Sequence, residues 1–332
     1  MSTVRVISGT YRHFEVTNQV FELVKGPQQG AKGWFVTVES AGFFGPDKTV
    51  VRIRYETPEC VELEGAAHFE AAAPFETDEE VMNRIDRRFE ILDKMTMATV
   101  SGAVRAMLVT GPPGVGKSFG VENQLEKYGM FEKISGARMK YEIVKGALTP
   151  LGLYLTLYRN SDKNNVIVFD DADNVFFDDT SLNLLKAALD TSERRRICWN
   201  SESRILKEEG VPNTFDFKGA VIFVTNLQFG NIRSKRLQDH LAALESRCHF
   251  VDLTINTDRE KMLRIRSVIQ RGTMLDRYDF SEEQRAELSV FFEANVNHFR
   301  ELSLRTVIKL ADLMSSFPND WQEMARVTCM TH

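Results

Sequence analysis

A glycine-rich segment in the first half of the chain carries the residue types that bind phosphate groups. Glycines let the backbone curl until successive N–H groups point at phosphate oxygens, a lysine bridges the β- and γ-phosphates, and a serine hydroxyl ligates Mg²⁺. An apolar run, 106–110, precedes the segment, and a helical pattern, 119–127, follows it. The pattern G-x-x-x-x-G-K-[ST] is matched by Gly111, Pro112, Pro113, Gly114, Val115, Gly116, Lys117 and Ser118, with Phe119 next. We therefore predict a phosphate-binding loop between a strand and a helix.

Two carboxylates follow another apolar run. Residues 166–169 read Val-Ile-Val-Phe, and Asp170 and Asp171 come directly after them. At the carboxyl end of a buried strand, Asp170 is suited to hold Mg²⁺ and Asp171 to act on an attacking water molecule. Asp173 is a weaker candidate that we expect to be solvated. The alternative interpretation is an acidic turn after a core strand.

A third apolar run, 220–225, ends in Asn226. A neutral amide at this position can orient a water molecule without cancelling the negative charge of a γ-phosphate. The alternative is an asparagine that merely forms the turn after a strand.

Together these motifs resemble the Walker A, Walker B and sensor 1 motifs of the AAA+ ATPase family, over roughly residues 77–315. The resemblance implies ATP and Mg²⁺ as cofactors, ATP hydrolysis, and a ring or spiral homo-oligomer, expected to be a hexamer. Many members carry Asp-Glu where this chain has Asp-Asp, a pairing similar to the initiator and helicase-loader branch, and the shorter Asp171 bears on the hydrolysis rate. Chain length and residues 181–190 are also similar to AAA-type ATPases of tailed phages, which would place the protein in the host cytoplasm.

Two arginines acquire roles from this resemblance. The Ser-Arg-Cys tripeptide around Arg247 is similar to that of clamp loaders, which implies that Arg247 reaches the γ-phosphate of the neighbouring subunit; Arg233 and Arg236 are alternatives. In the C-terminal helical region, Arg305 resembles the sensor 2 arginine, with Arg300 as its competitor. For each of them an arginine on a solvated surface is the plain alternative.

The elements that must position these residues begin with a region rich in strands, residues 1–65. It contains seven basic and eight acidic residues, so its charge does not favour nucleic acid. We expect turns at Gly26-Pro27 and at 45–47, and a linker over 66–76. Runs of β-branched and aromatic residues at 4–7, 14–16, 33–38 and 50–55 predict a small antiparallel β domain.

Helical and strand patterns alternate from residue 77 to 253, which predicts a parallel sheet covered by helices. The remainder, 254–332, is helical in pattern and contains capping boxes at Thr257–Glu260 and Ser281–Gln284. The predicted fold class is therefore α/β: an AAA+ P-loop NTPase core with a parallel sheet, a C-terminal helical lid and a small N-terminal β domain.

Two further segments are candidates for contact with a threaded substrate. The first, 145–150, occupies the position of the family's pore loop but lacks its aromatic-hydrophobic-glycine pattern. The second, 191–217, contains three consecutive arginines, 194–196, and Trp199, which suit phosphate pairing and base stacking with single-stranded nucleic acid. A basic run is equally typical of a solvated surface.

Composition narrows the functional classes. The net charge of −5 argues against a broad basic surface, and no stretch approaches the length of a membrane span. We predict an ATP-hydrolysing oligomeric motor or switch in nucleic-acid metabolism. The alternatives are a protein remodeller that uses the N-terminal domain as its adaptor, and a nucleotide-binding scaffold with little turnover. Asp171, Asn226 and Arg247 weigh against the scaffold.

Overall fold

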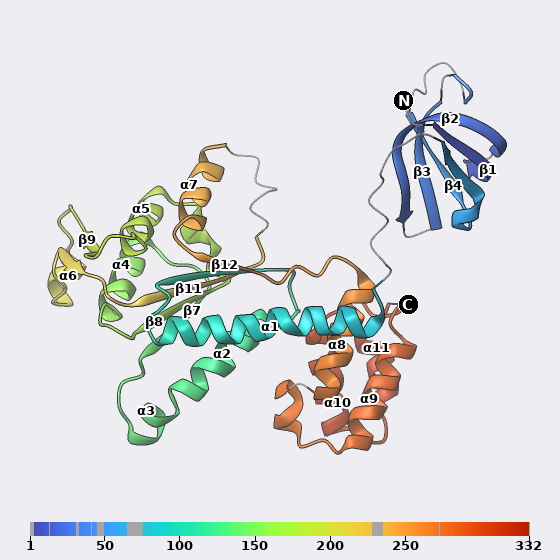
Figure 1. Cartoon of the computed structure of the whole chain (residues 1–332). Helices are drawn as coiled ribbons and strands as arrows, with labels where there is room; N and C mark the ends of the chain where they lie inside the picture. Colours follow the sequence, from blue (N-terminus) through green and yellow to red (C-terminus); the bar gives the residue numbers. More distant parts are fainter. Residues whose placement is uncertain are drawn as a thin grey trace. The chain divides into compact units, whose positions relative to one another are not determined.

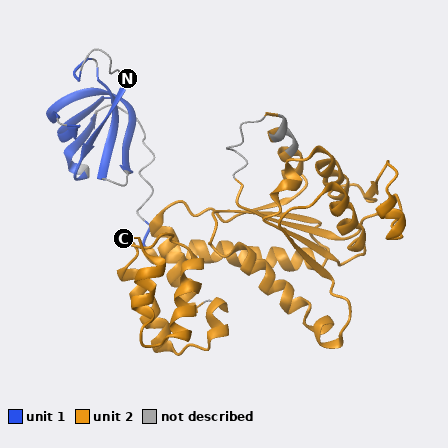
Figure 2. Cartoon of the chain, turned by 180° about the vertical axis from the view of Figure 1, so that it is seen from behind, with its two compact units in different colours: residues 1–77 blue, residues 78–332 orange. Residues whose placement is uncertain are grey.

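The computed structural model describes residues 3–12, 14–30, 33–40, 42–44, 50–64, 76–227, 235–271 and 273–331. The chain forms two compact units, Met1–Thr77 and Asp78–His332 (Figure 2). The predicted linker lies outside the described residues except for Glu76, as do Arg233 and the side chain of Arg236. Among the helices described, none combines the length and the apolar character needed to cross a membrane.

The N-terminal unit is an antiparallel sheet whose strands follow the order β2-β3-β4-β1-β5. Strand β2 also pairs with β1, so the sheet closes on itself. Fully buried side chains of Val4, Val6, Val36, Val38 and Ile53 fill its interior. The strands are β1 (Thr3–Tyr11), β2 (Phe14–Gly30), β3 (Gly33–Glu39), β4 (Val50–Tyr55) and β5 (Val61–Glu64), with a short helix, η1 (Pro58–Cys60), before β5.

Strand β2 differs from the sequence prediction. We expected a turn at Gly26-Pro27, but β2 continues through these residues to Gly30. Its register with β3 shifts between Leu23 and Lys25 and again between Lys25 and Gln28. A proline, which has no N–H to donate, is tolerated in a strand at such irregularities. The expected turn is therefore wrong, and the unpredicted strand β5 adds one more edge to the sheet.

The second unit contains a parallel five-stranded sheet in the order β12-β6-β11-β8-β7 (Figure 1). The three apolar runs that precede the candidate site residues form strands β6, β8 and β11. Strand β11 comes after β8 in the sequence but lies between β6 and β8 in the sheet. The strands are β6 (Ala106–Thr110), β7 (Tyr141–Lys145), β8 (Val166–Asp170), β11 (Ala220–Thr225) and β12 (His249–Asp252).

Helices cover both faces of this sheet because side chains alternate along each strand. On β6, Met107 and Val109 pack with residues of α1 and α2, whereas Leu108 packs with residues of α4, α5 and α7. A hairpin formed by β9 and β10, with α6 in its loop, is inserted before β11. The elements are α1 (Asp78–Val100), α2 (Lys117–Tyr128), α3 (Met130–Ser135), α4 (Pro150–Arg159), η2 (Asp173–Phe176), α5 (Asp179–Ala188), β9 (Arg196–Cys198), α6 (Arg204–Glu208), β10 (Thr214–Asp216) and α7 (Lys235–Glu245).

The C-terminal part of this unit is a helical lid with its own core, which includes the fully buried Phe292 and Trp321. The capping box predicted at Ser281 is present, since Gln284 N donates to Ser281 Oγ and Ser281 N donates to Gln284 Oε1. The lid consists of α8 (Asp258–Arg271), η4 (Thr273–Tyr278), α9 (Glu282–Ala294), α10 (Leu304–Ser316) and α11 (Trp321–Cys329).

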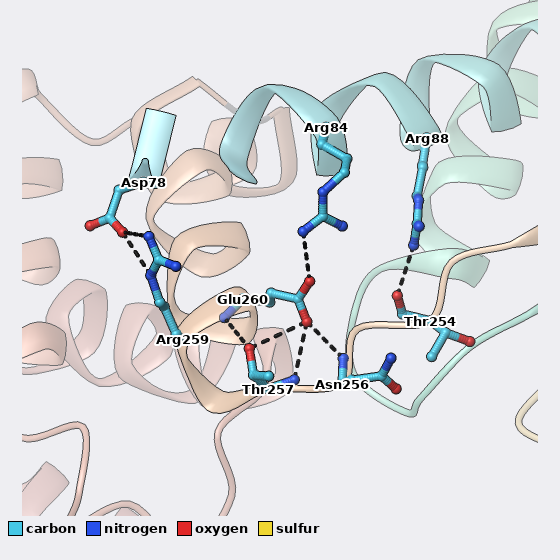
Figure 3. Close-up of polar contacts among 8 residues, drawn as sticks. All are labelled: Asp78, Arg84, Arg88, Thr254, Asn256, Thr257, Arg259 and Glu260. Carbon is cyan, nitrogen blue, oxygen red and sulfur yellow. Dashed lines mark hydrogen bonds and ion pairs between the residues drawn. The ribbon is translucent and has the colours of Figure 1, made fainter. Parts of the chain in front are cut away.

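Helix α1 runs from the sheet to the lid and holds the segment that connects them (Figures 1 and 3). Arg88 donates to the carbonyl oxygen of Thr254 at 2.9 Å, and Arg84 donates to Glu260 at 3.0 Å. Glu260 also accepts from Thr257 N at 3.1 Å, while Glu260 N donates to the Thr257 hydroxyl, so the predicted Thr257–Glu260 capping box is present too. Arg259 pairs with Asp78 at the start of α1. We call this set of contacts the hinge network.

The candidate nucleotide site

The glycine-rich loop connects β6 to α2 and packs directly against the lid. A Cβ atom on Gly111 would lie 2.9 Å from the carbonyl oxygen of Leu253, and one on Gly114 would lie 2.5 Å from Ser303 Cβ. Gly114 also has a φ of 74°, a conformation that favours glycine. Its carbonyl oxygen accepts from Leu304 N at 2.8 Å. The loop conformation is therefore tied to the first turn of α10.

Lys117 is 5% exposed and points back into this loop. Its Nζ donates to the carbonyl oxygens of Gly111 and Pro112, both at 2.8 Å, and to Asn226 Oδ1 at 2.6 Å. Burial lowers the pKa of Lys117 to about 8, against the opposing effect of the carboxylates of Asp171 and Asp170. Lys117 is thus a buried cation held by oxygen atoms at the centre of the site.

Ser118 and Asp170 meet beside it. Ser118 Oγ donates to Asp170 Oδ1 at 2.7 Å, and the other oxygen of Asp170 lies 3.3 Å from Lys145 Nζ. Lys145 also pairs with Glu122 Oε1 on α2 at 2.5 Å. Hydroxyl and carboxylate oxygens are the ligands that Mg²⁺ prefers in proteins, so this pair fits that ion.

Asp171 and Asn226 lie at the ends of adjacent strands. Asn226 Nδ2 donates to Asp171 Oδ1 at 2.8 Å, while its Oδ1 accepts from Lys117. Asn226 joins the two because β11 lies between β6 and β8. Asp171 is exposed to solvent and has a φ of 51°, the left-handed region that Asn and Asp tolerate better than most residues. The geometry leaves its carboxylate accessible to a water molecule.

Asp173 does not behave as expected from the sequence. It lies in η2, where it is half-buried and its side chain is hydrogen-bonded to Thr225. Burial raises its pKa. The expectation that Asp173 is solvated is therefore wrong, because the turn after β8 folds this carboxyl group back against β11.

The arginine candidates lie at different places. Arg305 is exposed in the first turn of α10 and is close enough to Lys117 for its charge to lower the pKa of that lysine. Arg300 instead donates to the carbonyl oxygen of Met330 at 2.9 Å. Arg247 lies just before the amino end of β12, and its Nη1 donates to the carbonyl oxygen of Ala243. Of the three, Arg305 is thus the arginine whose charge acts on the loop of its own chain.

The arginines of the 191–217 segment mostly have partners inside the chain. Arg194 and Arg196 both pair with Asp216, at 2.7 and 3.5 Å. Arg195 is buried. Trp199 is half-buried and its ring centre lies 5.6 Å from that of Tyr154. The side chains of Arg194 and Arg196 are 65% and 51% exposed, whereas Arg195 is buried and Trp199 half-buried. Contact of this segment with nucleic acid therefore stays a prediction, and Arg195 and Trp199 are the members of the set that packing withdraws from the surface.

The other candidate segment, 145–150, is attached to the site. Leu148 N donates to Asn174 Oδ1 at 3.2 Å, and Asn174 Nδ2 donates back to Leu148 O at 2.6 Å. Asn174 lies in η2, shortly after Asp171. With Lys145 beside Asp170, the segment contacts the candidate catalytic strand end at two points.

A pocket of about 300 Å³ opens beside the loop, between α1, α2, α8 and η4. Gly116 and Phe119 line it, together with Phe89 and Arg264. The Arg264 guanidinium lies 3.5 Å from the centre of the Phe89 ring, and burial lowers its pKa to about 10. Sequence reasoning missed Phe89 and Arg264, because each belongs to an ordinary amphipathic helix pattern and no motif marks it.

The sheet order, the glycine-rich loop after β6, the acids after β8 and the C-terminal helices give the second unit the α/β fold of AAA+ ATPases. No protein-family model matches the sequence. The chain is 36% identical over 252 residues to an uncharacterized 36.7 kDa protein from the nrdC-mobD intergenic region of Enterobacteria phage T4, with 75% of this chain and 76% of that protein covered. The chain belongs to the same family as this phage protein.

Solved structures with a similar fold are distant. NtrX from Brucella abortus in complex with ATP has 13% identity and a TM-score of 0.41, over 76% of this chain and 54% of NtrX. Domain III of the Thermotoga maritima replication initiation protein DnaA has 10% identity and a TM-score of 0.39, over 72% of this chain and 90% of that domain. The ADP form of the Aeropyrum pernix ORC2 protein has 13% identity and a TM-score of 0.37, over 72% and 67%.

Proposed function

We propose that the protein binds ATP at the glycine-rich loop and hydrolyses it. The observation that carries this proposal is the chain of contacts from Lys117 through Asn226 to Asp171 across three adjacent strand ends. Such a group combines a cation for phosphate oxygens, an amide to orient a water molecule and a carboxylate to accept its proton. ATP hydrolysis by Lys117, Asn226 and Asp171 distinguishes the proposed function from that of a scaffold that only binds the nucleotide.

The residues of the loop suit the phosphates of a nucleotide. The ammonium group of Lys117 donates hydrogen bonds to two backbone carbonyl oxygens and one amide oxygen. Phosphate oxygens can take the place of these acceptors while the buried charge of Lys117 stays where it is. The pocket of about 300 Å³ beginning at Gly116 presents the Phe89 and Phe119 rings to a nucleoside, beside polar groups that include Arg264, which is itself paired with Asp86 at 3.0 Å.

Ser118 and Asp170 are the residues that would hold Mg²⁺, since their oxygens already converge at 2.7 Å. The ion would offset part of the negative charge on the phosphates. Lys145, paired with the second oxygen of Asp170, keeps that carboxylate oriented toward Ser118.

We further propose a ring or spiral homo-oligomer, expected to be a hexamer, in which Arg247 completes the site of a neighbouring subunit and Arg305 acts from the lid of the same subunit. An arginine supplied in trans stabilises charge on the transferring phosphoryl group and makes hydrolysis depend on assembly. The support is that Arg247 lies just before the amino end of β12, whereas the loop leading to Lys117 follows the carboxyl end of β6 and Asp171 follows that of β8.

For the partner we favour nucleic acid, as in a replication accessory or helicase-loading ATPase, on the strength of the Asp-Asp pair and the Ser-Arg-Cys tripeptide. A protein partner is the second candidate, favoured by one observation. Phe14 and Phe43 in the N-terminal unit are 56% and 54% exposed and belong to one aromatic cluster with Phe21 and Phe44. Exposed aromatic rings on a unit with nearly equal numbers of acidic and basic residues are typical of an interface with another protein.

ATP hydrolysis and the choice between a nucleic-acid and a protein partner are tested by measuring the ATPase rate of the purified chain alone and with single-stranded DNA, duplex DNA or an unfolded protein. We expect magnesium-dependent hydrolysis that single-stranded or duplex DNA accelerates. Acceleration by unfolded protein alone would favour the remodeller. A chain that binds ATP without hydrolysing it under any of these conditions would contradict the motor and favour the scaffold.

A further inference from the structure

A second polar pocket lies on the side of the parallel sheet where the strands begin, opposite to the carboxyl ends that carry the candidate nucleotide site. It has a volume of about 210 Å³ and forms where β6, β8 and β11 begin. Arg105 directly precedes β6, Lys163 lies in the turn before β8, and Lys218 lies just before β11. Because the strands are parallel, these amino ends share the edge opposite to Asp171 and Asn226. The pocket is therefore separate from the candidate nucleotide site.

Basic side chains predominate in the lining of this pocket. Arg105, Lys163, Arg195 and Lys218 line it, together with a single acidic residue, Glu193. The protein as a whole carries a net charge of −5, so this local excess runs against the charge of the chain. Four cations that converge on one cavity repel one another unless an anion lies among them. The lining thus has the charge of an anion site.

Arg195 is the strongest single indication of an anion. It is 7% exposed, and its Nη1 and Nη2 donate to the carbonyl oxygens of Ala188 at 3.0 Å and Gly219 at 2.8 Å. Its guanidinium also lies 5.0 Å from the centre of the Phe217 ring. These partners are neutral, and no described carboxylate forms an ion pair with Arg195. A buried cation without a counter-ion is costly, so its presence calls for compensation.

Arg105 adds a second guanidinium beside the first. One of its terminal nitrogens donates to the carbonyl oxygens of Thr191 at 3.1 Å and Ser192 at 2.9 Å, which fixes the side chain in place. Burial and the charge of Arg105 together lower the pKa of Arg195 to about 10. The carboxylate of Asp190 is partly exposed and accepts from Ser192 N, and this hydrogen bond, with the charges of Arg247 and Arg105, lowers its pKa. Two guanidinium groups are thus held close together.

We propose that this pocket binds a phosphate group, supplied either by a nucleic-acid backbone or by a free phosphate compound. Guanidinium forks match the geometry of phosphate oxygens, and lysines at the rim add point charges. The buried Arg195 and the anchored Arg105 provide the fixed part of the site, while Lys163 and Lys218 are exposed and free to adjust to either source. The proposal does not depend on ATP hydrolysis.

The test uses the full-length chain with Lys117→Ala, which on the proposed function weakens phosphate binding at the glycine-rich loop. Inorganic phosphate is titrated by calorimetry, and a fluorescent oligothymidylate by anisotropy at several salt concentrations. The pocket variant is Lys163→Ala with Lys218→Ala, because Arg195 also anchors two backbone carbonyls. The control, Lys133→Ala with Lys207→Ala on α3 and α6, makes the same change in net charge away from the pocket.

We expect the pocket variant to weaken phosphate binding by about tenfold or more, because charge-assisted hydrogen bonds are lost, while the control keeps the parent affinity. If the phosphate comes from nucleic acid, the pocket variant also lowers the salt dependence of oligothymidylate binding, by roughly 1.4 in log–log slope for two contacts. Loss of inorganic phosphate binding alone assigns the site to a free phosphate compound. The proposal is overturned if the parent binds neither ligand, or if the pocket variant loses no more affinity than the control variant.

Discussion

At the residue scale, the side chains of the candidate site form hydrogen bonds with one another in the absence of a substrate. Asn226 illustrates this, since its amide accepts from Lys117 at 2.6 Å and donates to Asp171 at 2.8 Å. An Asn226 side chain turned the other way would place its NH₂ group against the lysine and its oxygen against the carboxylate. The two charges therefore determine which way the amide faces, and a single amide aligns a cation and a carboxylate across the ends of adjacent strands.

Replacement of Lys117 by alanine should abolish tight ATP binding while the fold remains intact. The change removes the buried ammonium that faces the β- and γ-phosphates, and it also relieves the cost of burying that charge. Binding of a fluorescent ATP analogue is the measurement, with circular dichroism to verify folding. Unchanged affinity in a folded Lys117→Ala protein would show that the loop is not the nucleotide site.

Asp171→Asn should preserve ATP binding and slow turnover on the order of 10²- to 10⁴-fold, because the amide keeps the shape but cannot accept the proton of the water molecule. Asparagine also tolerates the left-handed backbone at this position, so the turn should survive. Steady-state hydrolysis is compared with that of Asp173→Asn, whose side chain is bonded to Thr225. If only the second variant is slow, Asp173 is the base.

At the element scale, helix α1 is the link between the α/β sheet and the lid. Its contacts with the hinge network use side chains from the first half of the helix, whereas Leu92 and Val100, further along, are buried against the sheet. The network fixes the segment 253–257, in which Leu253 O limits the space at Gly111. The position of the lid, and with it the first turn of α10 against Gly114, therefore depends on polar contacts of α1.

The Arg84–Glu260 pair should contribute measurably to stability. Both side chains are partly buried and Glu260 also caps α8, so a double-mutant cycle with Arg84→Ala and Glu260→Ala should give a coupling free energy on the order of 1 kcal/mol in urea unfolding. The exposed Arg87–Glu90 pair on the same helix serves as the control and should give less than about 0.5 kcal/mol. Equal couplings would mean that the hinge network adds nothing beyond a surface ion pair.

At the scale of the whole molecule, the parallel sheet separates two chemically different edges. The carboxyl ends bring together the glycine-rich loop, the acids after β8 and Asn226. The amino ends bring together Arg105, Lys163 and Lys218 around a basic pocket, and Arg247 also lies at this side, where its charge acts on Asp190. A finger on that side must reach the site of another copy, which makes assembly part of the proposed mechanism.

Mixing two inactive variants should restore ATPase activity if Arg247 acts in trans. Arg247→Ala keeps an intact pocket and Lys117→Ala keeps an intact finger, so some interfaces of a mixed oligomer pair the two intact halves. Hydrolysis is measured over a mixing titration, with light scattering to verify mixed oligomers. Specific activity of the unmodified chain should also rise with concentration. Mixed oligomers without rescue, together with concentration-independent activity, would exclude the shared site.

The sequence by itself determined the local parts of this protein. Apolar runs bounded by turn residues predicted β6, β8 and β11, and the Thr257 and Ser281 capping boxes marked helix starts that the structure contains. These features depend on neighbours within a few positions, so periodicity and cap chemistry reveal them. The Gly26-Pro27 turn was predicted wrongly, because pairing with β3 along the strand outweighs the local preference of those two residues.

Only the tertiary structure decided which residues meet. Nothing local in the sequence states that β11 inserts between β6 and β8, yet this order places Asn226 between Lys117 and Asp171. The same order brings together the basic residues of the second pocket, which lie up to 113 positions apart in the sequence, from Arg105 to Lys218. Arg194 and Arg196 are exposed, as the basic run suggested, but both pair with Asp216 across a hairpin, while Arg195 between them is buried. Such contacts arise from sheet order and packing between distant segments, for which local periodicity carries no signal.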